Sequence, residues 1–180
     1  MSSNRNKVLL SAIRVVLKPS LALRGFEFDA GSRTFRKHFG SCVQIINLQS
    51  GVRAIEGRLT VNLAIFHPVY RQGEAASPVP ERPKEYDCLL RARLSTLRDT
   101  PITKFFRSRI AKPSGLLGWW LITPADYWWQ LSDDEAKVQD ELKRIEVLLV
   151  DRGLDWLALN CDEAGLKEAY ENITCRKAQS

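Results

Sequence analysis

The chain has 180 residues and a formal net charge of +6; 44% of its residues are hydrophobic and 27% are charged. These values exclude an intrinsically disordered chain, a collagen-like fibre and a disulfide-stabilised miniprotein. No apolar run approaches the roughly 20 residues of a membrane-spanning helix. We therefore expect one cytoplasmic domain over residues 1–180, large enough to fold without a metal or a disulfide.

The charges are unevenly distributed along the chain. Residues 1–81 contain 11 Lys and Arg against 5 Asp and Glu, and residues 82–113 contain 9 against 3. Residues 114–171 contain 5 against 13, so a basic body carries an acidic C-terminal part. This asymmetry favours long-range attraction of a charged partner, although it does not determine the fold.

The N-terminal segment, Asn4–Leu23, has the apolar spacing of an amphipathic helix. Pro19 should kink this helix or divide it in two, because proline has no amide proton to donate to the preceding turn. Gly25 follows as a candidate C-cap. The apolar positions are Val8, Leu9, Ala12, Ile13, Val16, Leu17 and Leu21.

The next segment, from Phe26 to Pro68, alternates apolar and polar residues with the period of β-strands. The simplest antiparallel registers place Thr34 opposite Ile45 and Asn47 opposite Thr60. The predicted strands are Phe26–Asp29, Arg33–His38, Cys42–Gln49 and Leu59–Phe66.

These registers sort the side chains into two faces, because neighbouring residues of a strand point to opposite sides of the sheet. One face is apolar, and the other is mostly polar and carries arginines. The apolar face contains Phe35, Ile46, Leu48, Leu59, Val61, Leu63 and Ile65. The second face contains Arg36, His38, Val43, Ile45, Asn47, Gln49, Arg58, Thr60 and Asn62.

The middle of the chain is less regular. Residues 70–84 are rich in Pro, Gly and Ala and predict a mobile loop. Tyr86–Leu94 alternates again and predicts a strand of the same sheet, with Arg91 and Arg93 on one of its sides. Thr100–Gly118 is basic and ambiguous, and Leu116–Ile122 is a candidate short strand.

The C-terminal part is predicted to be helical. Ser132 and Glu135 have the spacing of a capping box, and the helix that follows should end at Arg152–Gly153. Leu154–Leu159 and Asp162–Glu171 predict two short helical pieces, before a disordered tail over residues 172–180. This order predicts an α+β domain: an antiparallel sheet with the N-terminal helix and the C-terminal helices packed on one face.

Several segments, taken in order, resemble one family of bacterial proteins. They are Val16–Pro19, Gly25–Phe26, Val43–Ser50, Val61–Leu63, Tyr86–Cys88, Arg91–Leu94, Trp119–Trp120 and Arg152–Leu157. Together they resemble the family known as domain of unknown function 4304, from about Lys7 to Glu171. The resemblance implies a compact bacterial cytoplasmic α+β domain, and it implies no activity, cofactor or catalytic residue.

Few residues are candidates for catalysis. The four cysteines (Cys42, Cys88, Cys161 and Cys175) lack C-x-x-C spacing, so we expect neither a zinc site nor another metal or cofactor. His38 falls beside Arg36 on the polar face, where a cationic neighbour makes it a poor base, and His67 ends a strand. We expect no catalytic residue. A hydrolase or nuclease of unknown type is therefore the last of three hypotheses, after the two that follow.

A second alternative is a nucleic-acid-binding protein, because the basic segment 82–112 lies close in sequence to tryptophans. Basic grooves with aromatic platforms bind single strands. The predicted polar face, however, contains no aromatic side chain on which bases could stack. The candidate residues for this alternative are Arg98, Lys104, Arg107, Arg109, Lys112 and Trp119.

The hypothesis that we favour from the sequence is a non-enzymatic interaction protein whose Arg-rich face binds an acidic protein partner. Arginine suits bidentate recognition of carboxylates better than lysine does. By analogy with other small basic bacterial domains, the partner would be a toxin or an effector, and the protein an immunity or antitoxin-like inhibitor or an accessory subunit. The candidate partner-binding residues are Arg36, Arg58, Arg91, Arg93, Asn47, Gln49 and Asn62.

Overall fold

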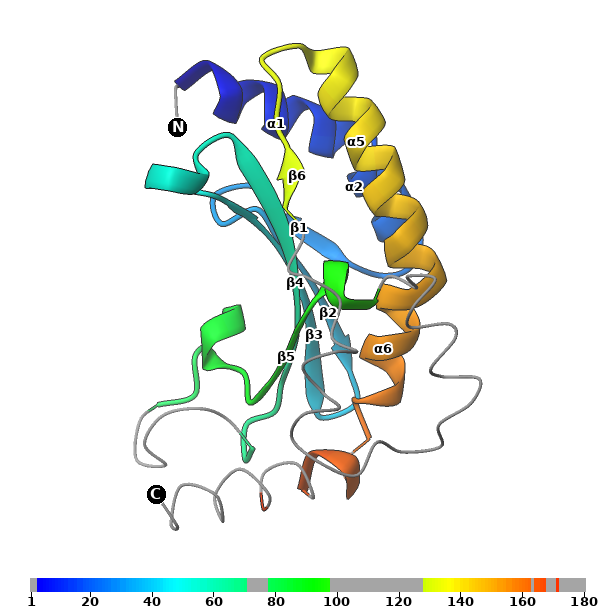
Figure 1. The fold of residues 1–180 in the computed structure, drawn as a ribbon. Helices are drawn as coiled ribbons and strands as arrows, with labels where there is room; N and C mark the ends of the chain where they lie inside the picture. The colour runs from blue at the N-terminus through cyan, green and yellow to red at the C-terminus, as the bar shows by residue number, and fades with distance from the viewer. Residues whose placement is uncertain (1–2, 71–77, 98–127, 163, 168–170, 172–180) are drawn as a thin grey trace, which may run out of the picture.

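The computed structural model describes residues 3–70, 78–97, 128–162, 164–167 and 171. It confirms the predicted α+β class: an antiparallel sheet, with the N-terminal helix and the C-terminal helices on one of its faces (Figure 1). The predictions for Thr100–Gly118, Leu116–Ile122 and the tail 172–180 lie outside the described residues, as do residues 71–77 of the predicted loop 70–84.

The N-terminal segment forms two helices, α1 (Ser3–Val15) and α2 (Leu17–Ala22), as the position of Pro19 predicts. Gly25 has a left-handed φ of 82°. Its amide donates to the carbonyl of Ala22, and the next amide, of Phe26, donates to the carbonyl of Leu21. This pair of bonds is a Schellman motif, and it confirms that Gly25 ends the helix.

The sheet has the strand order β1-β2-β3-β4-β5, with every neighbouring pair antiparallel, and β6 also pairs with β4. Short 3-10 turns, η1 to η3, lie between or after the strands. The strands are β1 (Glu27–Asp29), β2 (Thr34–Phe39), β3 (Cys42–Ser50), β4 (Arg58–Phe66), β5 (Leu90–Arg93) and β6 (Trp129–Gln130). The turns are η1 (Arg53–Ile55), η2 (Glu85–Asp87) and η3 (Leu94–Leu97).

The predicted registers are wrong by two residues, because Thr34 pairs with Asn47, and Asn47 pairs with Asn62. For the first pair the cause is the β2–β3 turn, which is Gly40–Ser41, with Gly40 at a φ of 58°, so that Phe39 still belongs to the strand. For the second pair it is the connection between Ser50 and Leu59, which pair with each other. A shift of two residues keeps every side chain on its side of the sheet. The predicted apolar face is therefore correct, and all seven of its residues are fully buried.

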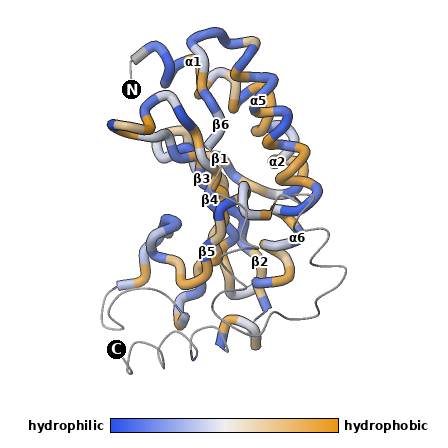
Figure 2. Tube along the Cα trace, viewed as in Figure 1, coloured by the Kyte–Doolittle hydropathy of each residue, from blue (hydrophilic) through white to orange (hydrophobic). Residues whose placement is uncertain are grey.

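Three helical segments complete the layer that covers this face: α5 (Glu135–Leu148), a π-helical turn (Leu149–Gly153) and α6 (Leu154–Leu159). Their apolar side chains join those of α1, α2 and the sheet in one core. Figure 2 shows hydrophilic and hydrophobic residues alternating along α5, as expected for a helix with one buried side. The core residues of α5 are Val138, Leu142 and Ile145.

The start of α5 is connected to α1. Asp134 is the N-cap, and its carboxylate accepts from the amide of Ala136, so the predicted capping box of Ser132 and Glu135 is wrong. Glu135 instead accepts a hydrogen bond of 2.7 Å from the hydroxyl of Ser11. Close by, Arg5 pairs with Asp133 at 3.0 Å. The carboxylates of this turn therefore join the first helix to the long C-terminal one.

Gly153 does not end the C-terminal helix, contrary to the prediction. Its φ and ψ are helical, −65° and −43°, and the chain continues directly into α6. A Cβ at this position would lie 3.0 Å from Cδ1 of Leu94 and 3.1 Å from Cδ2 of Leu149, both of which are buried. The glycine is required here because the π-helical turn and η3 approach each other closely.

We expect the substitution Gly153→Ala to lower the free energy of unfolding by about 1 kcal/mol, because overpacking of the two leucines exceeds the gain in helix propensity. Gly165→Ala is the matched control, since its Cβ would meet only a carboxylate oxygen at 3.9 Å. Urea denaturation of both variants measures the difference. A Gly153→Ala protein more stable than wild type would contradict the proposed close contact.

Gln44 is a buried polar residue on the face that the helices cover. Its amide donates to the carbonyl of Leu157 at 3.2 Å and to the Sγ of Cys161 at 3.5 Å. The carbonyl of Leu157 is one of the last four of α6, which lack partners within the helix. Gln44 therefore attaches the end of α6 to the middle of the sheet.

We expect Gln44→Ala to destabilise the protein by about 2 kcal/mol, because it leaves a buried carbonyl without a donor. Gln130→Ala, at an exposed position of β6, should change stability by less than about 0.5 kcal/mol. Chemical denaturation measures both values. Equal effects of the two substitutions would show that the bond to Leu157 contributes little.

Candidate functional site

The second face of the sheet is partly covered by the chain itself. Residues 78–89, here called the strap, cross this face on the side opposite to α5 and α6 (Figure 1). Cys88 of the strap is buried in a small apolar cluster with Val43, Ile45, Ala64 and Phe66. The prediction of one mostly polar, open face therefore needs correction, because its apolar centre is sealed by the strap.

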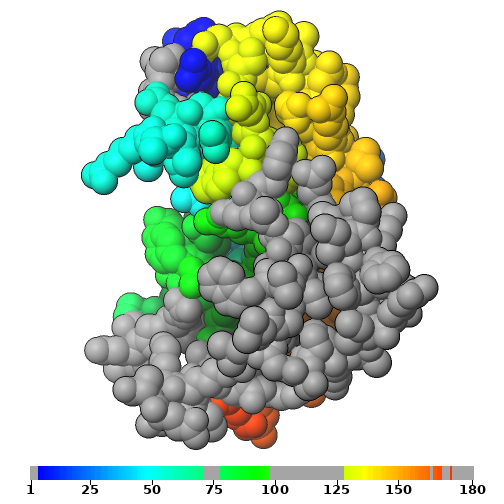
Figure 3. Space-filling model, in the orientation of Figure 1, coloured from blue at the N-terminus to red at the C-terminus, as the bar shows by residue number. Residues whose placement is uncertain are grey.

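A local turn shapes the strap. The amide of Lys84 donates to the carboxylate of Asp87 at 2.8 Å, and the amide of Asp87 donates to the carbonyl of Lys84 at 3.0 Å. The predicted strand Tyr86–Leu94 is consequently too long. Its first residues belong to the 3-10 turn η2, and the ladder with β4 begins only at Leu90. Residues of the strap and of β5, in green, form part of the left edge of the molecule in Figure 3.

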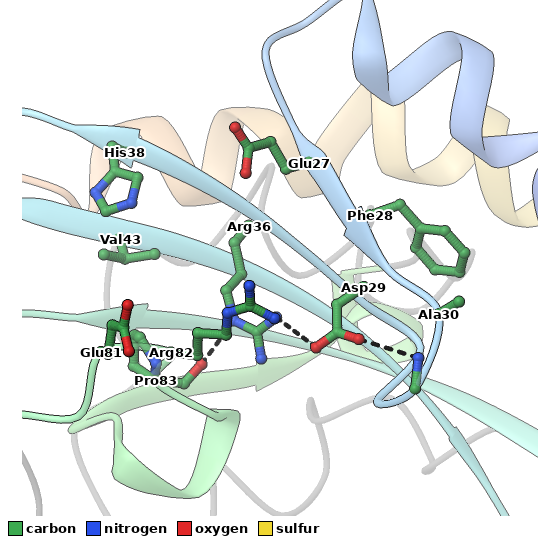
Figure 4. A pocket seen from close by; sticks show the side chains of 11 residues that line it. Glu27, Phe28, Asp29, Ala30, Arg36, His38, Val43, Glu81, Arg82 and Pro83 are labelled. Atoms are coloured by element: carbon green, nitrogen blue, oxygen red, sulfur yellow. Dashed lines mark hydrogen bonds and ion pairs between the residues drawn. The ribbon is translucent and has the colours of Figure 1, made fainter.

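On one side of the strap lies a hollow of about 530 Å³, which Figure 4 shows. Arg36 is at its centre: Nε donates to the carbonyl of Pro83 at 2.9 Å, and the guanidinium pairs with Asp29 at 3.3 Å. The Arg36 side chain is only 12% exposed. The hollow is lined by Glu27, Phe28, Asp29, Ala30, Gly31, Arg36, His38, Val43, Glu81, Arg82 and Pro83.

The structure therefore uses two of the predicted partner-binding residues internally. Arg36 holds the strap against the sheet. Asn47 donates to the carbonyl of Ser32 and to the hydroxyl of Thr34, which fixes the turn that follows β1. Neither side chain is arranged to reach a partner.

On the other side of the strap lies a second hollow of about 300 Å³, here called the Arg91 hollow. It contains four of the predicted residues, so the structure brings these together. Asn62, which is 9% exposed, donates to Oε1 of Gln49 at 2.9 Å. The hollow is lined by Gln49, Asn62, Glu85, Arg91, Ala92 and Arg93.

The arginines near this hollow come from two strands. Arg91 and Arg93 pair with Ala64 and Asn62 of β4, which places both on the second face, and Arg58 lies further along β4 on the same face. Arg58 and Arg91 are exposed, and neither forms an ion pair with a residue that the structure describes. The seventh predicted residue, Arg58, thus lies on the same face but does not line the hollow.

Trp128 and Trp129 precede α5 and point to different surroundings. Trp129 is buried in the core and pairs with Leu59, whereas Trp128 is half-buried and its ring lies 5.2 Å from the guanidinium of Arg93. An arginine stacked on an indole is held in a defined plane. The residues of the nucleic-acid alternative, Arg98, Lys104, Arg107, Arg109, Lys112 and Trp119, lie outside the described part of the chain.

His67 and His38 have different environments. The amides of Val69 and Tyr70 donate to Nδ1 of His67, so the proton of the neutral ring is on Nε2, which lies 3.1 Å from the hydroxyl of Ser41. This arrangement ends β4 with a turn, as predicted for His67. His38 is exposed at the rim of the larger hollow.

The described cysteines are buried thiols, and burial raises the pKa of Cys88 and of Cys161, which keeps both protonated. Over the described ranges, His, Cys, Asp and Glu side chains do not gather in groups of three or more that could ligate a metal ion. Among the same residues, every helix is too short or too polar to cross a membrane.

Sequence reasoning missed Glu85, Ala92 and the strap as parts of the site. The signal was indirect: prolines before Lys84 argue against a strand there, and the 84–87 spacing permits a capped turn. The position of this turn over the sheet depends on contacts between distant segments, which no local pattern contains.

Comparison with known proteins identifies the family. The model of the family described as Domain of unknown function (DUF4304) matches residues 17–159. The chain belongs to the DUF4304 family. The match spans both hollows, the strap and the helices from α2 to the end of α6, and it leaves out α1. No curated protein and no solved structure matches this DUF4304 chain significantly.

The contacts of Asp29, which pairs with Arg36 beside the strap, should depend on pH. A hydrogen bond from Ser32, together with those from Gly31 and Arg36, lowers the pKa of Asp29 below its ordinary value. Since the folded-state pKa is the lower one, the stabilisation is complete above the unfolded-state value of 3.8 and is lost as the pH falls through the folded-state value.

We therefore expect Asp29→Asn to destabilise the protein at pH 7 and to cost progressively less as the pH falls below about 4. Thermal unfolding of the wild type and the variant across this range measures the difference. Asp155→Asn, at an exposed helical position, is the control. A difference that does not depend on pH would show that the charge of Asp29 is unimportant.

Proposed function

We propose that this DUF4304 protein is a non-enzymatic interaction protein that binds an acidic region of a protein partner through the second face of its sheet. The observation that carries the proposal is that Arg58 and Arg91 are exposed on this face without an ion-pair partner among the described residues. Arg36, on the same face, is by contrast paired with Asp29.

The position of the two arginines supports the proposal. Both are on strands whose backbones are fixed by ladder bonds, so the backbone at these positions does not have to be ordered on binding. Complementary charge raises the association rate and selects between partners.

The specific form that we propose is an inhibitor of the immunity or antitoxin type, or an accessory subunit, with a toxin or an effector as the acidic partner. This step rests on analogy with other small basic domains and not on the geometry. Cytoplasmic localisation is part of the same proposal, since such inhibitors act where their targets are made.

A binding experiment with defined probes tests the proposal. The probes are a fluorescein-labelled peptide of alternating Glu and Ser, its Gln-for-Glu counterpart and a single-stranded oligothymidylate of equal length. We expect fluorescence anisotropy to show binding of the acidic peptide only, weakening as salt rises. Tighter binding of the oligonucleotide would contradict the proposal and favour the nucleic-acid alternative.

The double substitution Arg58→Glu with Arg91→Glu should weaken peptide binding about tenfold or more, because attraction is replaced by repulsion at both positions. The matched control is Arg14→Glu with Lys18→Glu, which changes the net charge equally on exposed positions of α1 and α2. Equal losses in the two double variants would show that only net charge matters and would exclude this face as the binding site.

A further inference from the structure

The Arg91 hollow has features that the surrounding face lacks. Its volume of about 300 Å³ lies at the lower end of the range for ligand sites, so it suits one side chain better than a larger molecule. Its lining comes from three parts of the fold: Glu85 of the strap, Asn62 with Arg91, Ala92 and Arg93 of the β4–β5 ladder, and Gln49 of β3.

The polar groups of this hollow are fixed in position. The bond from Asn62 to Gln49 uses Oε1 of Gln49, which leaves the Nε2 group of Gln49 as a donor without an acceptor among the described residues. Asn62 is more than nine-tenths buried, so its amide cannot turn away. The guanidinium of Arg93, at the end of β5, is fixed by stacking on the ring of Trp128.

The charges favour an occupant with one negative charge. The lining contains Arg91, which forms no ion pair with a described residue, and one carboxylate, Glu85. Glu85 repels a doubly charged phosphate more strongly than it repels a carboxylate. The guanidinium of Arg91 can bind both oxygens of a carboxylate, which a lysine at this position could not do.

The larger hollow does not offer the same chemistry. Its buried cation, Arg36, is already paired with Asp29 and bonded to Pro83, and exposed Glu27 and Glu81 lie in the lining. Figure 4 shows both interactions of Arg36 directed to groups of the protein itself.

We propose that the Arg91 hollow receives the side-chain carboxylate of one aspartate or glutamate of the partner. This inference rests on the proposed function and deepens it: the hollow selects a single residue, whereas Arg58 attracts the acidic region as a whole. Arg91 is the specificity-determining residue, with Gln49 as a second donor.

The test uses small probes that do not depend on the peptide experiment. The side-chain amide signals of Gln49 and Asn62 are followed by NMR during titration with N-acetylglutamate α-amide, with N-acetylglutamine α-amide as the neutral control and with inorganic phosphate. We expect saturable shifts with the glutamate compound alone. Absence of shifts, equal shifts with the neutral compound or tighter binding of phosphate would each overturn the assignment to a carboxylate.

Arg91→Lys separates charge from geometry, because it keeps the charge and loses the bidentate contact. We expect about tenfold weaker binding of the glutamate compound by this variant and no change for Arg14→Lys. Gln49→Ala should weaken binding about threefold. Since all three positions are exposed, we expect each variant to fold. The NMR spectrum itself verifies this.

The two proposals can fail separately. If the acidic peptide binds but Arg91→Lys behaves as the wild type, the face binds acidic partners without a selective hollow. If the glutamate compound shifts the two amide signals but the peptide does not bind, the hollow recognises a carboxylate and the proposed function is wrong.

Discussion

The two-residue period of the central strand β4 is the constraint on which the rest of the structure depends. Because β4 pairs with β3, β5 and β6, its alternation is transmitted to the whole sheet. Leu59, Val61, Leu63 and Ile65 point to the helices, while Thr60, Asn62 and Ala64 lie on the opposite face. Burial of the first set drives folding, and the second set provides a rigid floor for the candidate site.

The strap converts a sheet face into two hollows with different chemistry. Buried apolar side chains beneath Cys88 hold it at the centre, and the bond from Arg36 to Pro83 holds it at one side. Arg36 is already paired with Asp29 and bonded to Pro83 within the protein. Arg91, on the other side of the strap, has no ion-pair partner among the described residues. In one hollow, therefore, an arginine holds the strap against the sheet. In the other hollow, as we propose, an arginine binds the partner.

Local patterns were sufficient to predict the fold and insufficient to predict the site. The strands, the division of the N-terminal helix and the Gly25 cap follow from periodicity and from two special residues, so they could be predicted. The registers, the role of Gly153 and the path of the strap could not, because each depends on contacts between distant segments: Leu94 against Gly153, or Pro83 against Arg36. Arg91, Arg93, Gln49 and Asn62 were named correctly as neighbours because strand alternation survives a register shift of two residues.

The contact between α1 and α5 has a consequence for biosynthesis. Ser11 and Arg5 find their partners more than a hundred residues later in the sequence, at Glu135 and Asp133. At translation rates of roughly 5–20 residues per second, α5 is synthesised on the order of ten seconds after α1. Until then the apolar side of the nascent α1 lacks its contacts with α5. During this interval the nascent polypeptide exposes apolar surface to chaperones. Its folding yield in a cell therefore depends on how quickly the ribosome reaches the last helices.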